Sequence, residues 1–261
     1  MREHGHYEHK QLGSRSFAIR LSHRGRFLLA RRLIAPWAGA RLLDYGCGDG
    51  TFMAQVVDLF PDAVGADYEP GQVADCRRRF ADYPRLRFST VQELRALASC
   101  FDLITCMEVL EHCRASEINE VLSDLRRLLA PSGTLLVSVP IEIGPSLILK
   151  QMIRRVAGWR NLGDYRYNER YTVGELVRMT LATARGAIAR PLYDNAPGLP
   201  PFHTHKGFNW RTLRERIGRE FALRRTCFSP FRLTGSLLNS QAWFICGARG
   251  SDCSSDGRHP Y

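Results

Sequence analysis

The feature that most constrains the fold of this chain is the stretch over residues 42–50, Leu-Leu-Asp-Tyr-Gly-Cys-Gly-Asp-Gly. Two apolar residues lead into Asp44, and three glycines then stand at alternate positions. Glycine has no Cβ, so the backbone of such a turn can pass close to a bound ligand. The spacing differs from the G-x-G-x-x-G of dinucleotide-binding turns. The pattern therefore predicts a buried strand that ends in a ligand-binding turn, with a simple tight strand-to-helix connection as the alternative.

Apolar runs separated by amphipathic segments follow along the chain. We expect strands over residues 63–68, 85–89, 101–107 and 134–140, the last after a turn at residues 131–133. Residues 118–129 carry the clearest helical stripe. Strands that alternate with helices predict a doubly wound α/β fold with a parallel sheet, whose ligand lies at the carboxyl ends of the strands. A helix over residues 208–219 and two strands over residues 221–228 and 241–248 complete the predicted architecture.

An acid, Asp67, ends the second expected strand about twenty residues after the glycine turn. A carboxylate at the tip of a second parallel strand can accept hydrogen bonds from both hydroxyls of a ribose. The ring of Tyr68 beside it offers a flat face to a purine. Alternatively, Asp67 caps the helix that begins near Pro70, and the two roles are compatible.

The D-x-G-x-G-x-G turn followed by this acid resembles the class I methyltransferases that bind S-adenosylmethionine. The resemblance implies a Rossmann-like, seven-stranded, mostly parallel sheet with an insertion between strands 5 and 6, and an antiparallel last strand. It also implies S-adenosylmethionine as the cofactor, with the methionine part at the glycine turn, the ribose at the acid, and the adenine beside Tyr68 and the residues after the third strand. The implied cofactor contacts are Asp44, Gly46, Cys47, Gly48, Asp67, Tyr68, Val91, Gln92 and Met107.

Directly after the fourth expected strand comes Glu108-Val109-Leu110-Glu111-His112. If this turn is helical, the i, i+3 and i+4 spacing puts the two carboxylates and the imidazole on one face. We predict Glu108, Glu111 and His112 as catalytic residues at the carboxyl edge of the sheet. The set predicts a divalent metal site, for Mg²⁺ or Zn²⁺, or else a pocket in which His112 is the lone general base.

A second source of ligands is the segment over residues 201–208, where His205 follows Thr204. The ubiquinone-biosynthesis O-methyltransferases, which this layout resembles most, carry a similar E-x-x-E-H segment and then a Thr-His pair followed by an aromatic residue, here Phe208. The small-RNA 3′-terminal 2′-O-methyltransferases also use E-x-x-E-H and a later histidine to hold a metal. The metal ligands predicted on this basis are Glu108, Glu111, His112 and His205.

Charge is distributed unevenly along the chain. The net charge is +11, yet residues 42–143 carry 9 basic and 16 acidic side chains, so the positive charge lies in the flanks. Nearly all of it is arginine, which suits bidentate contact with phosphate or carboxylate. The flanks predict an anionic substrate, an anionic membrane surface or RNA as a partner, unless the arginines only reflect a GC-rich genome.

The long segment over residues 141–206 is predicted to be a substrate lid. Within it, residues 144–159 read as a helix in which apolar and basic residues interleave. Its apolar side comprises Leu149, Met152, Ile153 and Val156. Such a helix could lie on a membrane surface or cover an apolar substrate, and it could equally be an ordinary packed helix with a basic solvent face.

Length and composition favour one domain with an insertion over two domains. We divide the chain into a basic helical segment over residues 1–40, a methyltransferase domain over residues 41–250 and a flexible tail over residues 251–261. The start of the chain does not look like a signal peptide, and no apolar run is long enough to span a bilayer. Eight cysteines without a C-x-x-C pair are expected to be reduced thiols, and the location predicted is cytoplasmic, with peripheral membrane contact as an option.

Three functions are compatible with these patterns. The leading one is methyl transfer to an oxygen, or a nitrogen, of a small-molecule, lipid or quinone-like acceptor. The alternatives within the same chemistry are ribose 2′-O-methylation of RNA and methylation of a sugar or natural product. A binding protein that keeps the cofactor fold without catalysis is the third function. The acceptor and the oligomeric state do not follow from the sequence.

Overall fold

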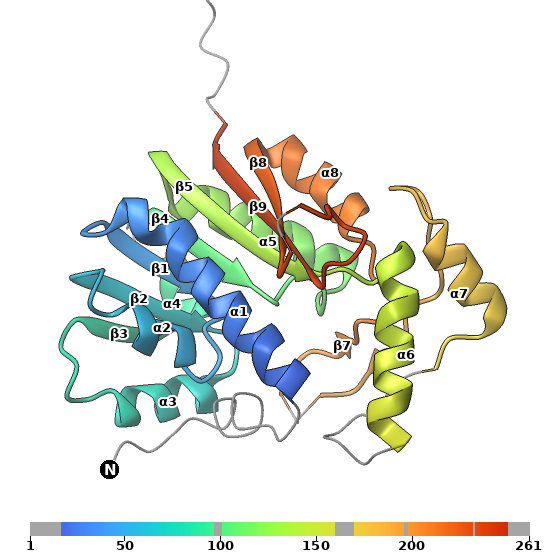
Figure 1. Ribbon diagram of the computed structural model, residues 1–261. Coiled ribbons are helices and arrows are strands. Elements are labelled where there is room, and N and C mark those ends of the chain that lie inside the picture. Colours follow the sequence, from blue (N-terminus) through green and yellow to red (C-terminus); the bar gives the residue numbers. More distant parts are fainter. Residues whose placement is uncertain (1–16, 97–100, 160–169, 196–197, 232, 250–261) are drawn as a thin grey trace, which may run out of the picture.

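The centre of the molecule is a seven-stranded sheet in the order β3-β2-β1-β4-β5-β9-β8. The computed structural model, drawn in Figure 1, describes residues 17–96, 101–159, 170–195, 198–231 and 233–249. The strands are β1 (Arg41–Tyr45), β2 (Asp62–Asp67), β3 (Leu86–Thr90), β4 (Phe101–Met107), β5 (Leu129–Pro140), β8 (Phe221–Ser229) and β9 (Gln241–Ala248). Strands β1 to β5 pair in parallel, and β9 is antiparallel to both β5 and β8. The predicted doubly wound, mostly parallel sheet is therefore confirmed.

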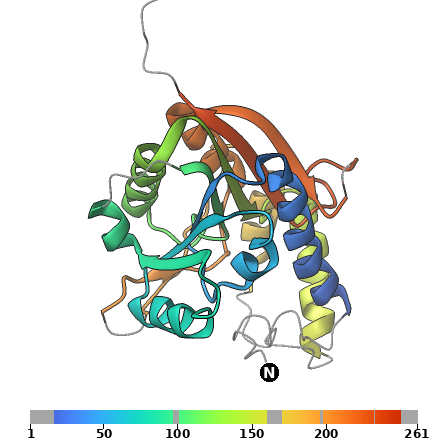
Figure 2. The ribbon, with the colours of Figure 1, turned by 90° about the vertical axis from the view of Figure 1, so that its left-hand side faces the viewer.

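Helices cover both faces of this sheet. One face is covered by α1 (Phe17–Ile34), α2 (Thr51–Val56) and α3 (Pro70–Arg79), and the other by α4 (Val91–Ala96), α5 (Ala115–Leu128) and α8 (Trp210–Glu220). A short 3₁₀ helix, η2 (Ala35–Trp37), joins α1 to the sheet. Between β5 and α8 the chain forms α6 (Pro145–Trp159), α7 (Val173–Thr180) and the two-stranded ribbon of β6 (Leu192–Tyr193) and β7 (Phe202–His203). Figures 1 and 2 show α1 and α6 on the same side of the molecule.

The two layers follow from side chains that alternate along buried strands. In β1, Leu42 packs under the helices of one face and Leu43 under those of the other, and both are fully buried. In α5, Ile118, Leu122 and Leu125 recur at helical spacing and face the sheet. The helical stripe expected over residues 118–129 is therefore confirmed as a core face.

Strand β5 differs from the expectation. The turn predicted at residues 131–133 lies inside the strand, because Leu129 already pairs with Phe101. The next pair joins Thr134 to Leu103, so β5 carries extra residues that bulge out between the two pairs. The glycine and proline signals of this segment thus mark a bulge in the strand rather than its start.

Helix α6 is tied to the end of β5 by a buried ionic group. The carboxylate of Glu142 is fully buried and accepts from Lys150 Nζ at 3.0 Å and from Arg154 Nη2 at 2.8 Å. Burial alone would raise the pKa of Glu142, but the attraction of the two cations outweighs it and holds that pKa at about 2. Lys150 also donates to the backbone carbonyls of Ile141 and Ser240. These contacts fix the first turns of α6 against the carboxyl end of the sheet.

Three further expectations concern the chain as a whole. Six cysteines lie in the described part of the chain, and all six are free thiols. Within the same residues, no helix combines the length and apolar character needed to cross a membrane. The predicted flexible tail and most of the segment before α1 lie outside the described residues, so the division into domains stays a prediction.

Replacing Ile104 of β4 by alanine should lower the free energy of unfolding by about 2–5 kcal/mol, because the side chain is fully buried and a cavity remains. The matched control is Ile153→Ala on α6, where the side chain is 51% exposed and the change should stay within about 0.5 kcal/mol. Urea denaturation of both variants measures the difference. Equal losses would contradict the assignment of Ile104 to the core.

Replacing Glu142 by glutamine should cost about 3–5 kcal/mol at neutral pH, because two cations lose their buried partner. The folded-state pKa lies below the ordinary value of 4.5, so the carboxylate stabilises the wild type above that pH. About 3 kcal/mol of this stabilisation should disappear as the pH falls from 4.5 toward 2.

Denaturation of wild type and Glu142→Gln across this pH range checks the prediction, and the two curves should converge in acid. Glu93→Gln is the control, since Glu93 pairs with Arg77 on the surface and should change stability little. A difference between wild type and Glu142→Gln that is the same at all pH values would contradict the ion-pair assignment.

Candidate active site

The glycine turn follows β1 and lies directly against the end of β2. Gly46 N and Cys47 N both donate to the carbonyl of Ala66, at 2.7 and 2.9 Å. Gly46 has φ +81°, and a Cβ built on it would lie 2.2 Å from Cγ2 of Val109 in the turn after β4. Only glycine fits there, because the left-handed backbone and the close approach both exclude a side chain. The turn thus joins the ends of β1, β2 and β4.

One predicted acid, Asp67, holds this turn, and another, Asp44, lies just before it. Asp67, the last residue of β2, accepts from Gly48 N at 2.9 Å and from Glu69 N at 3.1 Å. Glu69, and not Asp67, is the N-cap position of α3. Asp44 is buried at the end of β1 and accepts from Thr105 Oγ1 at 2.7 Å. Burial raises the pKa of Asp44 to about 7, against the lowering effect of the Thr105 hydrogen bond.

The remaining predicted cofactor contacts differ in how far their side chains are exposed. Tyr68 is 48% exposed at the carboxyl edge, where a flat ligand could reach its ring. Met107 ends β4 and is partly exposed. Val91 is buried among the core residues under α4, whereas Gln92 is exposed, so their side chains point to different surroundings. All of these cofactor contacts stay predictions.

Glu108 does not share a face with the other two predicted catalytic residues. The segment after β4 is an irregular turn and not a helix, and Glu108 adopts φ +58°. A left-handed conformation costs a residue with a side chain about 1–2 kcal/mol. It turns the carboxylate toward Arg26, at 3.0 Å from Nη1, and toward Gln241, whose Nε2 donates at 3.2 Å. The expectation of one helical face is wrong at this position, because the backbone reverses at Glu108.

Glu111 is the most unusual polar residue of this edge. Its side chain is fully buried, and neither carboxylate oxygen has a hydrogen-bond partner among the described residues. Burial raises the pKa of Glu111, and the neighbouring charge of Glu108 adds to this. A buried carboxylate without a hydrogen-bond donor is costly unless it is protonated or a cation lies beside it.

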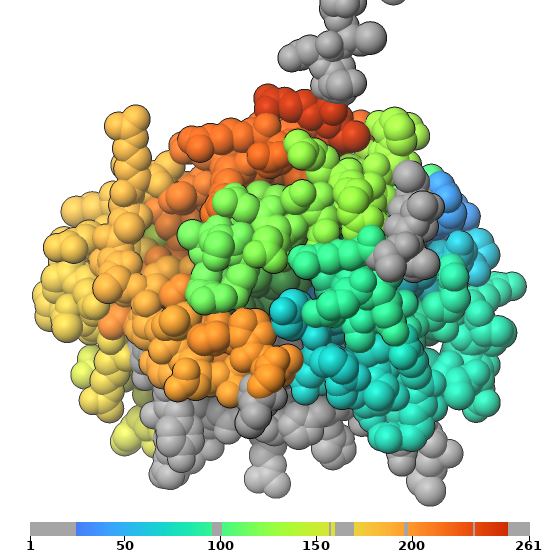
Figure 3. All heavy atoms as spheres, turned by 180° about the vertical axis from the view of Figure 1, so that it is seen from behind, coloured from blue at the N-terminus to red at the C-terminus, as the bar shows by residue number. Residues whose placement is uncertain are grey.

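His112 is oriented by the ribbon of β6 and β7. Its Nδ1 lies 2.8 Å from the carbonyl oxygen of His203, and His203 N donates to the carbonyl of His112 at 2.9 Å. A carbonyl only accepts, so Nδ1 donates to it, and Nε2 is the ring nitrogen that remains to act as a base or a metal ligand. Figure 3 shows the segment after α7, in orange, lying against the turn before α5, in green.

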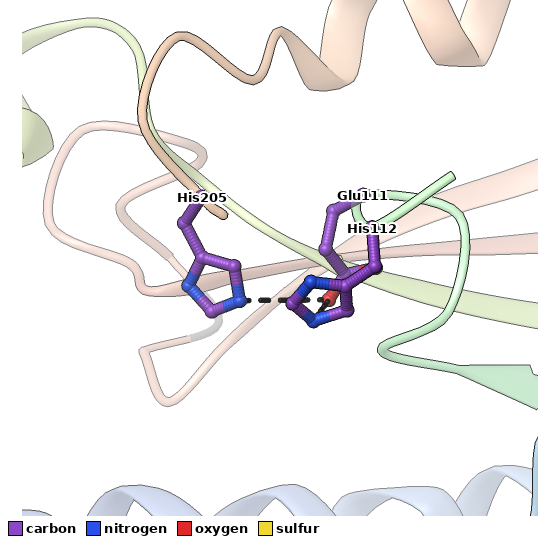
Figure 4. A group of neighbouring side chains, drawn as sticks. All are labelled: Glu111, His112 and His205. Atoms are coloured by element: carbon purple, nitrogen blue, oxygen red, sulfur yellow. Dashed lines mark ion pairs between the residues drawn. The ribbon is translucent and has the colours of Figure 1, made fainter. Parts of the chain in front are cut away.

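His205 completes a group of three side chains. Its Nε2 lies 3.9 Å from Glu111 Oε1, which is also the distance from His112 Nε2 to that oxygen. Figure 4 shows a dashed line from each imidazole to the same carboxylate oxygen of Glu111. Loss of hydration lowers the pKa of His205 to about 3, although 36% of its side chain stays exposed. The ring is therefore neutral at pH 7 and offers a lone pair.

The three residues fit a divalent cation. One ligand atom from each of Glu111, His112 and His205 lies within 4.8 Å of the others. With bonds of about 2.1 Å, two ligands of one ion lie at most about 4.2 Å apart, so a small contraction suffices. The structure brings together three of the four predicted metal ligands and does not bring Glu108 to them.

Two residues that sequence reasoning did not single out support this group. The guanidinium of Arg190 donates to the backbone carbonyls of Glu111 and Thr204, and it stacks over the ring of Phe208. His203 orients His112 through its backbone. Arg190 gives no local signal in the sequence, because its contact with Glu111 joins residues 79 positions apart.

Comparison with known proteins agrees with the fold. Residues 43–135 match a family model described as a methyltransferase domain. A ubiquinone biosynthesis O-methyltransferase of Azorhizobium caulinodans is 26% identical over 67% of this chain and 78% of its own length. One of Roseobacter denitrificans is 32% identical over 54% of this chain and 58% of its own length, so that match spans less than two thirds of the relative.

Solved structures show the same fold. The N-methyltransferase NodS from Bradyrhizobium japonicum WM9, in complex with S-adenosylhomocysteine, superposes with a TM-score of 0.54 at 13% identity and covers 87% of each chain. The sheet order and the solved structure show the class I methyltransferase fold, and the matched domain and the relatives support an S-adenosylmethionine-dependent methyltransferase.

Proposed function

We propose that the chain transfers the methyl group of S-adenosylmethionine to an oxygen of a small, quinone-like or otherwise apolar acceptor. The observation that carries the proposal is the buried carboxylate of Glu111, which accepts no hydrogen bond from the described residues and lies beside two imidazoles at the carboxyl edge of the sheet. The two relatives described above are named for O-methylation in ubiquinone biosynthesis, and this supports an oxygen nucleophile and a quinone-like acceptor.

The reaction is a direct displacement. The acceptor oxygen forms a bond to the methyl carbon, the bond from that carbon to the sulfonium sulfur breaks, and S-adenosylhomocysteine leaves. Because a sulfonium is a good leaving group, alignment of the two substrates and exclusion of water supply much of the acceleration. The hydroxyl proton must also leave the acceptor, and this is the task that we assign to the group around Glu111.

Glu111, His112 and His205 would hold a divalent cation such as Mg²⁺ or Zn²⁺ at this place. When bound, such a cation lowers the pKa of a hydroxyl that reaches it. His112 is kept in the required tautomer by the His203 carbonyl, and His205 stays neutral because of its low pKa. Arg190 fixes the backbone on both sides of the group.

The cofactor would lie across the glycine turn. The carboxylate of Asp67 would accept from the ribose hydroxyls while it holds Gly48 N, and Tyr68 would lie against the adenine. The glycine turn also packs against Val109, two residues before Glu111. The proposed cofactor site and the proposed acceptor site are therefore adjacent.

Replacing Asp67 by asparagine should raise the Kd for S-adenosylhomocysteine by about 10- to 100-fold, because a hydrogen bond to a charged group contributes about 1.5–3 kcal/mol. Isothermal titration calorimetry measures the change. Asp62→Asn at the opposite end of β2 is the matched control, since Asp62 pairs there with Arg87 on the surface. Unchanged affinity in Asp67→Asn would remove Asp67 from the cofactor site.

Replacing Glu111 by glutamine should reduce turnover by at least ~10²-fold and weaken Mn²⁺ binding, while S-adenosylhomocysteine still binds. Glu117→Gln is the matched control, because Glu117 caps α5 nearby and pairs with Arg114. Activity with and without chelator, and titration with Mn²⁺ followed by electron paramagnetic resonance, give the two readouts.

The outcomes separate the candidate mechanisms. If turnover survives in Glu111→Gln, the group around Glu111 has no catalytic role. If His112→Ala is inactive but a chelator has no effect on the wild type, His112 acts as a general base without a cation. Transfer of labelled methyl to RNA, and not to organic-soluble acceptors, would contradict the proposed acceptor class in favour of ribose methylation.

A further inference from the structure

Helix α6 exposes most of its apolar side. The structure confirms a helix where the sequence predicts one, but the described residues do not cover its apolar face. The exposed fractions lie between 41% and 81% for Ile148, Leu149, Met152, Ile153, Val156 and Trp159. Six large apolar side chains on four turns of one helix are more than a surface normally exposes, and such a patch marks an interaction site.

Two neighbouring elements extend this apolar surface. Leu28 of α1 is 58% exposed, and the connection between β8 and β9 exposes four large apolar side chains. These are Phe231, Leu233, Leu237 and Leu238, with exposed fractions between 51% and 99%. Lys150 of α6 donates to the Ser240 carbonyl at 3.2 Å, and Figures 1 and 2 show α1, α6 and this connection on one side. We call the exposed apolar residues of these three elements the α6 face.

Hydrogen bonds from one buried side chain hold the backbone of the β8–β9 connection. Asn239 is almost fully buried beneath it and accepts from Phe231 N at 2.6 Å. Its Nδ2 donates to the Phe231 carbonyl at 2.6 Å and to Thr234 Oγ1 at 3.0 Å. The hydrogen bonds hold the backbone while the apolar side chains point outward. A buried asparagine that fixes an exposed apolar loop indicates that this exposure is maintained and is not a consequence of loose packing.

The charged residues of α1, α6 and the β8–β9 connection are all basic. Residues 17–34, 145–159 and 230–240 contain nine arginines and lysines and no acidic residue. Of the six whose side chains the structure describes, four form ion pairs within the protein, namely Arg26, Arg31, Lys150 and Arg154. Arg32 and Arg155, next to the apolar residues, are exposed. The segment over residues 42–143, by contrast, has a net charge of −7 from 9 basic and 16 acidic side chains.

We propose that the α6 face docks on the surface of an anionic membrane. An apolar helix face with Trp and Ile, flanked by arginines and lacking acids, lies in the plane of a lipid interface with its apolar side among the acyl chains. Each basic residue near an anionic surface adds about 1 kcal/mol of attraction. The charge asymmetry of the chain also orients it, since the acidic cofactor half is repelled from the lipid headgroups.

Docking would place the proposed acceptor site at the membrane. Helix α6 starts at the carboxyl end of β5 and is held there by the buried group of Glu142, Lys150 and Arg154. The same edge of the sheet carries Glu111 and His112. A lipid-dissolved acceptor could thus reach the site without crossing water, and this consequence alone rests on the proposed function. The docking itself does not require catalysis.

The test is sedimentation of the full chain with vesicles of phosphatidylglycerol and phosphatidylcholine in equal parts, compared with vesicles of phosphatidylcholine alone. The wild type should sediment with the anionic vesicles and less at high salt. Replacing both Met152 and Val156 by serine should weaken binding at least ~10-fold, because these side chains leave water on docking. Both are more than half exposed, so the variant should fold.

The matched control replaces Val173 and Leu181 by serine, two exposed apolar residues at the ends of α7. This variant should bind vesicles like the wild type. Affinity for S-adenosylhomocysteine, unchanged in both variants, shows that they fold.

Glu111→Gln should sediment fully, so failure of catalysis is distinguishable from failure of docking. The proposal is overturned if the wild type stays in the supernatant, if both serine variants bind equally, or if light scattering shows that the α6 face joins two copies of the chain instead.

Discussion

The parallel pairing of β1 with β2 on one side and β4 on the other is the constraint on which the rest of the structure depends. It brings the ends of three strands to one edge, so that the glycine turn, Asp67 and the turn after β4 meet there. The contact of Gly46 with Val109 shows how closely the turns must fit. Since each turn belongs to a different strand, a shift of register in any pair would separate the cofactor groups from Glu111.

Two residues at this edge of the sheet lower the free energy of unfolding. Glu111 is buried without a donor, and Glu108 holds a left-handed backbone conformation. Both features cost free energy in the isolated chain. Such costs are typical of functional sites, and they support the proposed cation site beside the two imidazoles. Glu142 is equally buried, but it pairs with two cations of α6 and attaches that helix to the end of β5.

Much of this arrangement could be predicted from the sequence. Buried parallel strands read as apolar runs, and the expected strands and helices agree with the structure within a few residues. The position of His205 beside Glu111 and His112 followed from a resemblance in motif layout. The reversal at Glu108, the bulge in β5 and the role of Arg190 did not follow, because each depends on contacts between distant residues. Likewise, the sequence indicated an amphipathic helix over residues 144–159 but left open whether its apolar side is covered.

The central claim is that Glu111, His112 and His205 form one cation-binding group beside the cofactor. Crystals of the protein with S-adenosylhomocysteine, soaked in Mn²⁺ and measured for anomalous scattering, test it most directly. The account predicts an anomalous peak within bonding distance, about 2.2 Å, of all three side chains. Clear density for S-adenosylhomocysteine at the glycine turn without any peak at these residues would contradict it.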